Sequence, residues 1–567
     1  MRKYFSIRLL FSLAVLAVSA KSFACTNILI SRGASADGST MVTYAADSHQ
    51  LFGELYLKKA ADWPQGSMLD VYSWDEGNYI GKIQQIDHSF QTVGNMNQYQ
   101  VTITETTFGG RADLVNKDGI VDYGSLIYIT LQRARTAREA IAIMNELTQQ
   151  YGYPSEGESF SIADPNEVWI MEMVGKGEEK GTVWVARRVP EGYICAHANQ
   201  ARIHTFPLND SENCLYSKDV ISFARSKGFF SGKDTDFSFC ETYCPLDFSG
   251  ARACEARVWA AFNILCDGSF TWVDEKGNEH INLASDYLDF AMGYNLSNKM
   301  PLFVKPAQKV SMRALSDVMR DHFEGTPMDM TQDVGAGPNH LPYRWRPMSF
   351  DVDGDTYVHE RAIATQQTGF WILCQARNWL PNEIGGILWF GVDDAATSAL
   401  TPIYTNITAS PECFREGNGS MLEYSPTSAF WQVNKVAHFA YLLYDRVAPV
   451  VRKEIEKHEN NCLESVAVTD QIALKLLQDG KKDEALSLIT EVSTSLSERM
   501  MSKWQQLESD LLVKFMDGNV KVQNEDGSYQ KNVESSRIPV SPEHPDFPER
   551  WLRGIVQDNG EVLKEKQ

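Results

Sequence analysis

The chain has 567 residues, of which 43% are hydrophobic and 22% charged, a composition typical of folded proteins and not of disordered ones. Its formal net charge is −21, and no run of lysine or arginine reverses that sign locally, which argues against nucleic acid as a partner. The length exceeds one ordinary core and predicts two structural parts, a large α+β unit and a helical appendix.

The segment 1–24 has the pattern of a secretory signal peptide. Basic residues precede an apolar run over residues 9–18, and the small residues Ser22 and Ala24 lie at positions −3 and −1 before Cys25. A transmembrane anchor needs about 20 apolar residues, roughly twice the length of this run. We therefore expect signal peptidase to remove residues 1–24. The mature chain, without a membrane span, is expected to be secreted or periplasmic.

A β-hairpin is predicted directly after the cleavage site. Residues 26–32 and 40–45 read as strands, and the stretch between them is rich in turn residues around 35–38. Folding the hairpin at this turn brings Asp47 beside Cys25, on a strand about 5 Å away. The sequence therefore places a carboxylate next to the first residue of the mature chain.

Further elements alternate between strands and helices. Strands are expected at 99–103, 159–163, 168–173 and 183–187, and helices at 125–134 and 137–149. Thr136 and Glu139 form a capping-box pattern at the start of the second helix. Blocks of strands with a helical pair between them predict stacked, largely antiparallel sheets flanked by helices.

The character of the chain changes near residue 425. Helix-forming runs follow at 430–457, 464–478 and 482–516, and the tail from 518 is polar and irregular at least in part. We divide the chain into a signal peptide (1–24), a catalytic domain (25–425), a helical portion (426–517) and a polar tail (518–567).

Five of the ten cysteines crowd one stretch, which is compatible with one or two disulfides in an exported protein: Cys214, Cys240, Cys244, Cys254 and Cys266. Cys240 and Cys244 lack a second Cys or His pair, so zinc is not expected there. The acidic stretch 351–355 has its glycine at another position than a calcium-binding EF-hand loop and lacks the terminal glutamate, so it reads as a turn. No metal or cofactor is predicted.

Cys25 is chemically special if cleavage exposes it. Its thiol then lies beside a free α-amine, which titrates near pH 8 and accepts the thiol proton. Asp47 would orient that amine. Two other interpretations of Cys25 stay open, a lipidated anchor residue and a structural half-cystine. Lipidation usually requires Leu at −3, where this chain has Ser22.

Several motifs resemble one known family. They are Cys25-Thr26-Asn27 and the segments 36–40, 46–48, 105–111, 156–160, 163–167 and 197–202. Together they are similar to the cysteine-type dipeptidase A family of the N-terminal nucleophile hydrolase superfamily. The likeness is dense over residues 25–205, thin near 379–391, and almost absent from the last hundred residues.

The resemblance implies a four-layer αββα sandwich, with Cys25 as nucleophile, Asp47 as its acidic partner and Asn199 as an oxyanion donor, completed near Thr107. Acylase relatives carry Arg three residues before the aspartate, whereas this chain has Tyr44. A replacement cation is therefore sought among three other arginines, of which Arg257 is favoured: Arg111, Arg202 and Arg257.

The function implied is hydrolysis of small peptides through a thioester, without a cofactor. Glu105 or Glu158, together with Arg111 or Arg202, would bind the free amine and carboxylate of a dipeptide. An amidase or acylase of the same superfamily, acting on N-acyl amino acids or conjugated acids, is the nearest alternative. A surface lipoprotein that binds peptides or glycans, lipidated at Cys25, is the alternative from another class.

Overall fold

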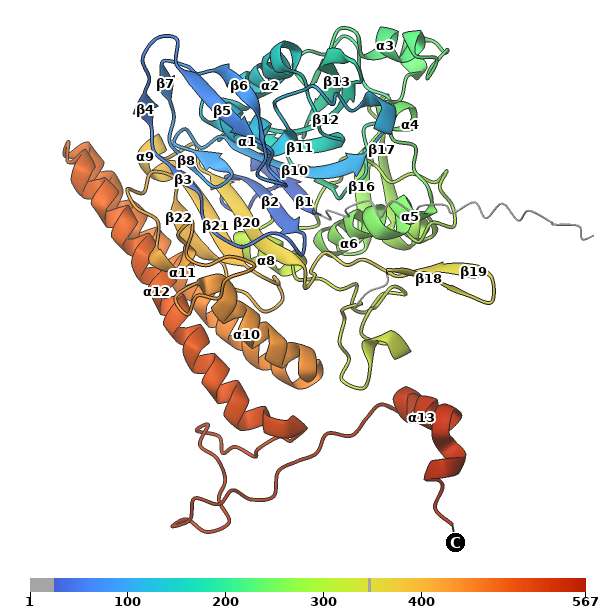
Figure 1. Cartoon of the computed structure of the whole chain (residues 1–567), viewed down its shortest axis with the longest axis vertical. Helices are drawn as coiled ribbons and strands as arrows, with labels where there is room; N and C mark the ends of the chain where they lie inside the picture. The colour runs from blue at the N-terminus through green and yellow to red at the C-terminus, as the bar shows by residue number, and fades with distance from the viewer. Residues whose placement is uncertain (1–24, 345–347, 567) are drawn as a thin grey trace, which may run out of the picture.

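The computed structural model describes residues 25–344 and 348–566 (Figure 1). The predicted signal peptide lies outside these residues. The described part combines helices and sheets, with a helical C-terminal region, as predicted. None of its helices is long and apolar enough to cross a membrane.

The first sheet carries the N-terminal hairpin and has six antiparallel strands. In spatial order they are β14 (Ile194–His197), β1 (Asn27–Ile30), β2 (Thr40–Asp47), β20 (Thr368–Ala376), β21 (Gly386–Val392) and β22 (Thr401–Tyr404). Leu29 pairs with Val42, and a further bridge joins Thr26 to Ala45. This register confirms the predicted hairpin and carries Asp47 to the level of Cys25.

The second sheet has eight strands. Their order is β15 (Cys214–Tyr216), β13 (Glu179–Arg188), β12 (Val168–Lys176), β11 (Gly157–Ala163), β10 (Thr102–Gly109), β9 (Met96–Asn97), β8 (Thr92–Val93) and β3 (Leu57–Lys58). The strand predicted at 99–103 is misplaced, because the ladder begins at Thr102. Before it, Gln100 adopts φ 67°, and the side chain of Asn97 accepts the N–H groups of Tyr99 and Val101.

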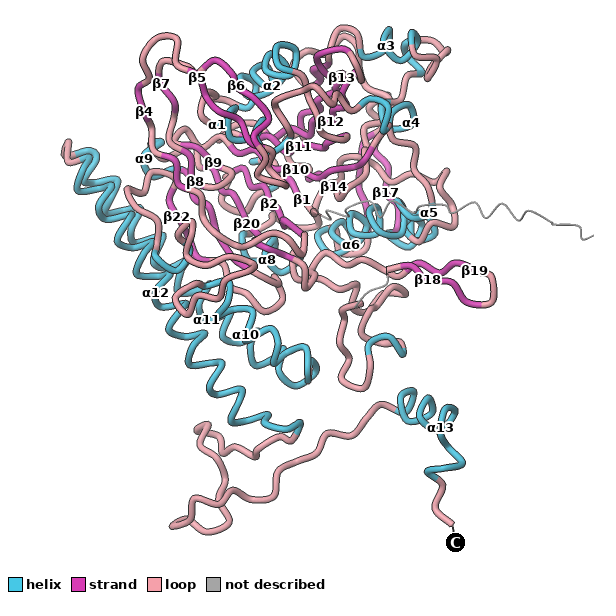
Figure 2. Tube along the Cα trace, viewed as in Figure 1, coloured by secondary structure: helices cyan, strands magenta, loops and turns pink. Residues whose placement is uncertain are grey.

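The two sheets contact each other through β1 and β2 on one side and β10, β11 and β12 on the other. Helices α1 (Tyr123–Leu131) and α2 (Ala137–Tyr151) pack on the second sheet, as Figure 2 shows. Thr136 caps α2 as predicted, but the Glu139 carboxylate accepts the N–H of Arg135 and not that of Thr136.

Helices of the second half cover the first sheet. Helix α6 (Ala256–Leu265) contacts β14, while α10 (Ala429–Leu442), α11 (Tyr444–Gln478) and α12 (Lys482–Phe515) pack near β21 and β22. Side chains of α11 and α12, such as Val447 and Trp504, belong to the same hydrophobic cluster as Ile28 of β1. The helical portion therefore shares a core with the sheet that carries Cys25.

Smaller elements lie outside the two large sheets and their main helices. The two-stranded ladders are β4 (Ala61–Asp62) with β7 (His88–Ser89), β5 (Met68–Tyr72) with β6 (Tyr79–Gln84), β16 (Ser269–Val273) with β17 (Glu279–Leu283), and β18 (Ser349–Val352) with β19 (Asp355–Val358). Short helices are α3 (Val220–Ser226), α4 (Phe239–Tyr243), α5 (Phe248–Gly250), α7 (Leu288–Ala291), α8 (Met312–Val318) and α9 (Asn382–Gly385). The acidic stretch 351–355 forms the β18–β19 turn, with Asp353 at φ 53°.

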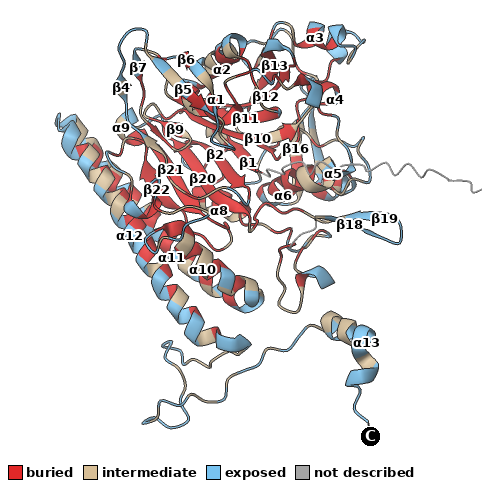
Figure 3. Ribbon diagram, viewed as in Figure 1, coloured by how far each residue is buried: buried red, intermediate tan, exposed pale blue. Residues whose placement is uncertain are grey.

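The tail beyond α12 is largely exposed and ends in α13 (Glu549–Leu563), which Figure 3 draws apart from the buried core. All ten cysteines lie in the described part of the chain, and each has a free thiol. The disulfides considered from the sequence are therefore wrong. The crowded cysteines are spread over separate elements: Cys240 lies against His204, whereas Cys214 lies on β15 and Cys266 ends α6.

Candidate active site

Cys25 begins the first sheet and is only 3% exposed in this full-length chain. Its Sγ lies 3.6 Å from Oε1 of Glu105 on β10 and 3.9 Å from the hydroxyl of Tyr44 on β2. Burial, followed by the negative charges of Glu105 and Asp47, raises the pKa of the thiol well above its usual range. These surroundings therefore favour the protonated thiol of Cys25 over the thiolate.

Asp47 ends β2 and is fully buried. Its carboxylate accepts a hydrogen bond from Oγ1 of Thr368 at 2.6 Å and pairs with Nη2 of Arg361 at 2.7 Å. Burial raises the pKa of Asp47, and the positive charge of Arg361 opposes that rise. Arg361 was not predicted from the sequence, because nothing local links it to a residue of the N-terminal hairpin.

Arg257 on α6 connects the start of the chain to Asn199. Its Nη1 donates to the carbonyl oxygen of Cys25 at 2.6 Å and to Oγ1 of Thr26 at 2.9 Å, and its Nη2 donates to Oδ1 of Asn199 at 2.9 Å. Burial lowers the pKa of Arg257 to about 10, so the group stays charged at neutral pH. The favoured arginine thus reaches the backbone of Cys25.

Asn199 follows β14 in the left-handed region, with φ 56°. This conformation is uncommon for a residue other than glycine, although asparagine tolerates it best, and it often marks a functional position. The amide nitrogen of Asn199 donates to the carbonyl oxygen of Thr107 at 2.7 Å. That bond uses one of the two amide hydrogens, so Asn199 is held rigidly between Thr107 and Arg257.

Glu105 and Glu158 form a buried carboxyl pair on neighbouring strands. Glu105 accepts the hydroxyl of Tyr44 at 2.7 Å, and Glu158 accepts Oγ1 of Thr107 at 2.6 Å. Burial raises the pKa of Glu105 to about 6 and that of Glu158 well above its usual range, the latter further raised by the charge of Glu105. The negative charge of Glu105 therefore opposes the ionisation of Glu158.

Arg111 and Arg202 lie in other environments. Arg111 donates from Nε to the carbonyl oxygen of Thr242, and its guanidinium stacks 3.9 Å from the ring centroid of Phe229. Arg202 forms a buried ion pair with Glu255 at 3.1 Å. Of the residues predicted for the site, the structure brings the other seven together near the first strand: Cys25, Asp47, Glu105, Thr107, Glu158, Asn199 and Arg257.

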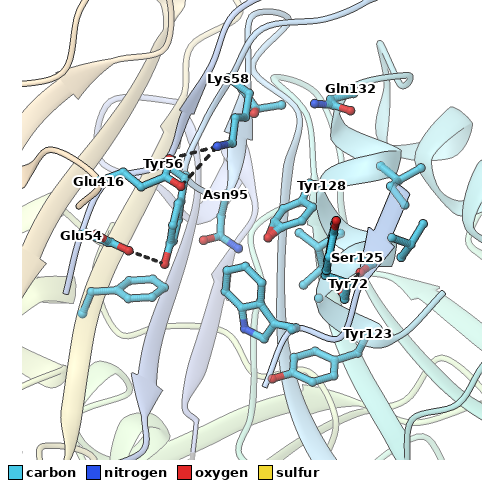
Figure 4. A pocket seen from close by; sticks show the side chains of 18 of the residues that line it. Glu54, Tyr56, Lys58, Tyr72, Asn95, Tyr123, Ser125, Tyr128, Gln132 and Glu416 are labelled. Atoms are coloured by element: carbon cyan, nitrogen blue, oxygen red, sulfur yellow. Dashed lines mark hydrogen bonds and ion pairs between the residues drawn. The ribbon is translucent and has the colours of Figure 1, made fainter. Parts of the chain in front are cut away.

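Two cavities adjoin this cluster. One of about 450 Å³ is lined largely by aromatic rings, including that of Tyr44; Figure 4 shows Tyr56, Tyr123 and Tyr128 around it. At its rim, Tyr56 donates to Glu54 at 3.1 Å, and Lys58 pairs with Glu416 at 3.0 Å. The other cavity, of about 320 Å³, is lined by Asn199, Arg257, Arg344 and Arg361, among others.

The chemistry of the cluster is that of a thiol flanked by carboxyl groups and held by an arginine. No group of three or more His, Cys, Asp or Glu side chains in residues 25–344 and 348–566 is arranged to hold a metal ion. The side chains around Cys25 can instead hold protons, orient an amine and donate hydrogen bonds to a developing oxyanion.

Comparison with known proteins bears on this chemistry. Residues 24–457 match the model of Peptidase family C69. A "Probable dipeptidase" of Salmonella dublin is 25% identical over 426 residues, which are 71% of this chain and 85% of that protein. A "Probable dipeptidase" of Latilactobacillus sakei is 24% identical, over 69% and 76% of the two chains, and "Dipeptidase A" of Lactobacillus helveticus is 22% identical, over 70% and 78%. Because the family match spans most of the sequence, the chain belongs to peptidase family C69.

Proposed function

We propose that this peptidase is a secreted dipeptidase in which Cys25, freed by removal of residues 1–24, acts as an N-terminal nucleophile. The observation that carries the proposal is the set of contacts around Cys25, where Glu105, Tyr44 and Arg257 converge on the first residue after the predicted cleavage site. The names of the relatives support a dipeptide as substrate. The contact of two sheets, each with helices packed on it, supports the four-layer αββα arrangement.

In the proposed mechanism the α-amine of Cys25 accepts the thiol proton, and Sγ attacks the peptide carbonyl carbon. The amide of Asn199 stabilises the tetrahedral oxyanion, a contribution of about 3 kcal/mol in comparable sites. The protonated amine then gives its proton to the leaving amino group, and a thioester remains. Water attacks the thioester, which releases the acid and restores the thiol.

The remaining side chains act as positioning residues. Arg257 holds the carbonyl group of Cys25 and the side chain of Asn199 in one arrangement. In the mature chain an α-ammonium group would lie near the buried carboxylates of Asp47 and Glu105. The positive charge of this ammonium group would favour the Cys25 thiolate, which the chain with residues 1–24 attached disfavours.

The test is hydrolysis of a panel of dipeptides and N-acyl amino acids by the enzyme purified after export, with its N-terminal mass determined. We expect a mass that begins at unmodified Cys25, and release of free amino acids from dipeptides. A lipid-modified N-terminus without hydrolysis would contradict the proposal. The aromatic cavity beside Tyr44 also suits an apolar acyl group, so an acylase is the second candidate, favoured if only N-acyl substrates are cleaved.

A further inference from the structure

The cavity beside Asn199 and Arg257 has no role in the steps described above. Its volume of about 320 Å³ falls within the usual range for ligand sites, about 300–1,000 Å³. Asn199 and Arg257 line it on the side where Arg257 contacts Cys25. The cavity therefore begins next to the proposed nucleophile.

Arginine side chains give the lining of this cavity its positive charge. Arg361 is engaged by Asp47, and Arg257 by Cys25 and Asn199. Glu360, the one acidic residue among the described residues that line the cavity, pairs with Arg252. The cavity thus offers positive groups, and its own carboxylate is already neutralised.

Arg344 has a donor that lacks an acceptor. The residue is 6% exposed, and it donates from Nη1 to the carbonyl oxygen of Met330 at 3.0 Å and from Nη2 to Asp333 at 2.8 Å. Its Nε is buried and has no hydrogen-bond partner among residues 25–344 and 348–566. A buried charged donor without an acceptor is costly, and in the lining of a cavity it points to a ligand that supplies the acceptor.

We propose that this cavity binds the free α-carboxylate of the peptide substrate, with Arg344 as the residue that receives it. This role rests on the proposed dipeptidase function, and it explains how the enzyme would select substrates with a free C-terminal carboxylate. In a dipeptide the carboxylate lies one residue beyond the scissile bond, about 3.8 Å along the chain, so it must lie in space that adjoins the nucleophile. A guanidinium group matches a carboxylate in both charge and planar geometry.

The experiment compares a dipeptide with its C-terminal amide, using enzyme exported from the full chain. We expect the wild type to cleave the free acid with a kcat/KM roughly 10- to 100-fold higher, because buried donors left without an acceptor penalise the amide. Arg344→Gln should remove most of this preference by raising KM for the acid alone. Arg344→Lys, which keeps the charge without the planar fork, should restore part of it.

Arg550→Gln is the matched control. Arg550 of α13 donates to carbonyl groups of Thr331, Asp333 and Gly337, so its loss loosens the same segment without changing the cavity lining. This control should keep the wild-type preference for the acid, and thermal unfolding should show that all variants are folded.

The outcomes separate the two claims. Wild-type enzyme that cleaves neither the dipeptide nor its amide overturns the proposed function. Three results would overturn the carboxylate site alone. The wild-type enzyme could cleave the dipeptide and its amide equally well. The Arg344→Gln variant could keep the full preference for the acid, or it could lose both activities in the same proportion. If Arg344→Gln does not fold, Arg344→Lys takes its place, and a full wild-type preference for the acid in that variant overturns the carboxylate site.

Discussion

Tyr44 donates its hydroxyl hydrogen to Glu105 across the two sheets, at 2.7 Å, and the accepting oxygen lies 3.6 Å from the thiol of Cys25. A tyrosine in this place leaves the thiol facing a carboxyl group. In the proposed mechanism, the positive charge that activates the thiol comes from the chain's own α-amine, with Arg257 nearby. The first predictions test this arrangement.

Cys25→Ser should lower turnover about 1,000-fold or more, since the hydroxyl is a far weaker nucleophile than a thiolate. Folding should be unaffected, because one atom changes and no cavity is created. Steady-state kinetics with one good dipeptide, alongside thermal unfolding, checks both points. Wild-type turnover in the serine variant would exclude a thiol nucleophile.

Tyr44→Phe should reduce both stability and turnover. It removes the hydroxyl that donates to Oε1 of Glu105 and leaves this buried acceptor with the weak thiol donor of Cys25, a loss of about 1–3 kcal/mol. Denaturant unfolding and kcat report the two effects. Tyr357→Phe, at an exposed position on β19, serves as the control and should change neither. Unaltered stability in Tyr44→Phe would show that Glu105 finds another donor.

Glu158→Gln should flatten the dependence of stability on pH. Burial raises the pKa of Glu105 to about 6 and that of Glu158 further, so the folded chain binds more protons than the unfolded chain above pH 4.5. Their contribution is fully present below pH 4.5 and is lost as the pH rises through 6 and beyond. Unfolding free energies at pH 4.5 and 7.5 should therefore differ less in Glu158→Gln than in the wild type. Glu146→Gln, at an exposed position on α2, is the control.

Asp47→Asn should destabilise the chain as well as slow it, by roughly 3–5 kcal/mol, because it leaves Arg361 buried without its counter-charge. Arg361→Met should cost a similar amount for the converse reason. The double variant should lose less than the sum of the two single losses, as measured by denaturant unfolding. Simple additivity would mean that the two side chains do not interact.

A short uncleavable tag before Cys25 should abolish activity without unfolding the protein, since the nitrogen of Cys25 then remains an amide with no basic lone pair. Activity assays and thermal unfolding of tagged and processed forms make the comparison. Full dipeptidase activity in a verified uncleaved chain would disprove the N-terminal nucleophile mechanism.

The hairpin and its consequence were predictable because their determinants are local. A turn-rich stretch at residues 35–38 between two short strands sets the register, and the register alone brings Asp47 to Cys25. The helices at 123–131 and 137–151 were similarly readable from spacing and from the Thr136 cap. Here local propensity and final structure agree.

The far half of the site had no local signal. Strands β20 and β21 are buried on both faces, so they read as continuous apolar runs without the alternation that identifies a half-buried strand. Arg361 meets Asp47 only because β20 pairs with β2. The proposed role of Arg344 depends on the cavity that it lines, which no short stretch of sequence reveals. Contacts of this kind depend on topology, which a single sequence does not encode in any short window.

The pairing of β2 with β20 has a consequence for how the chain reaches its native state. Cys25 begins a hairpin whose second strand, β2, pairs with β20 far along the chain, and Arg320 and Arg377 behind that sheet pair with Glu459 and Asp470 of α11. Closing such long loops is slow, because the chain loses conformational entropy before the stabilising contacts form. Refolding rates should therefore depend on residues of α11 that lie far from the thiol, and the surroundings of Cys25 should be among the last to assemble.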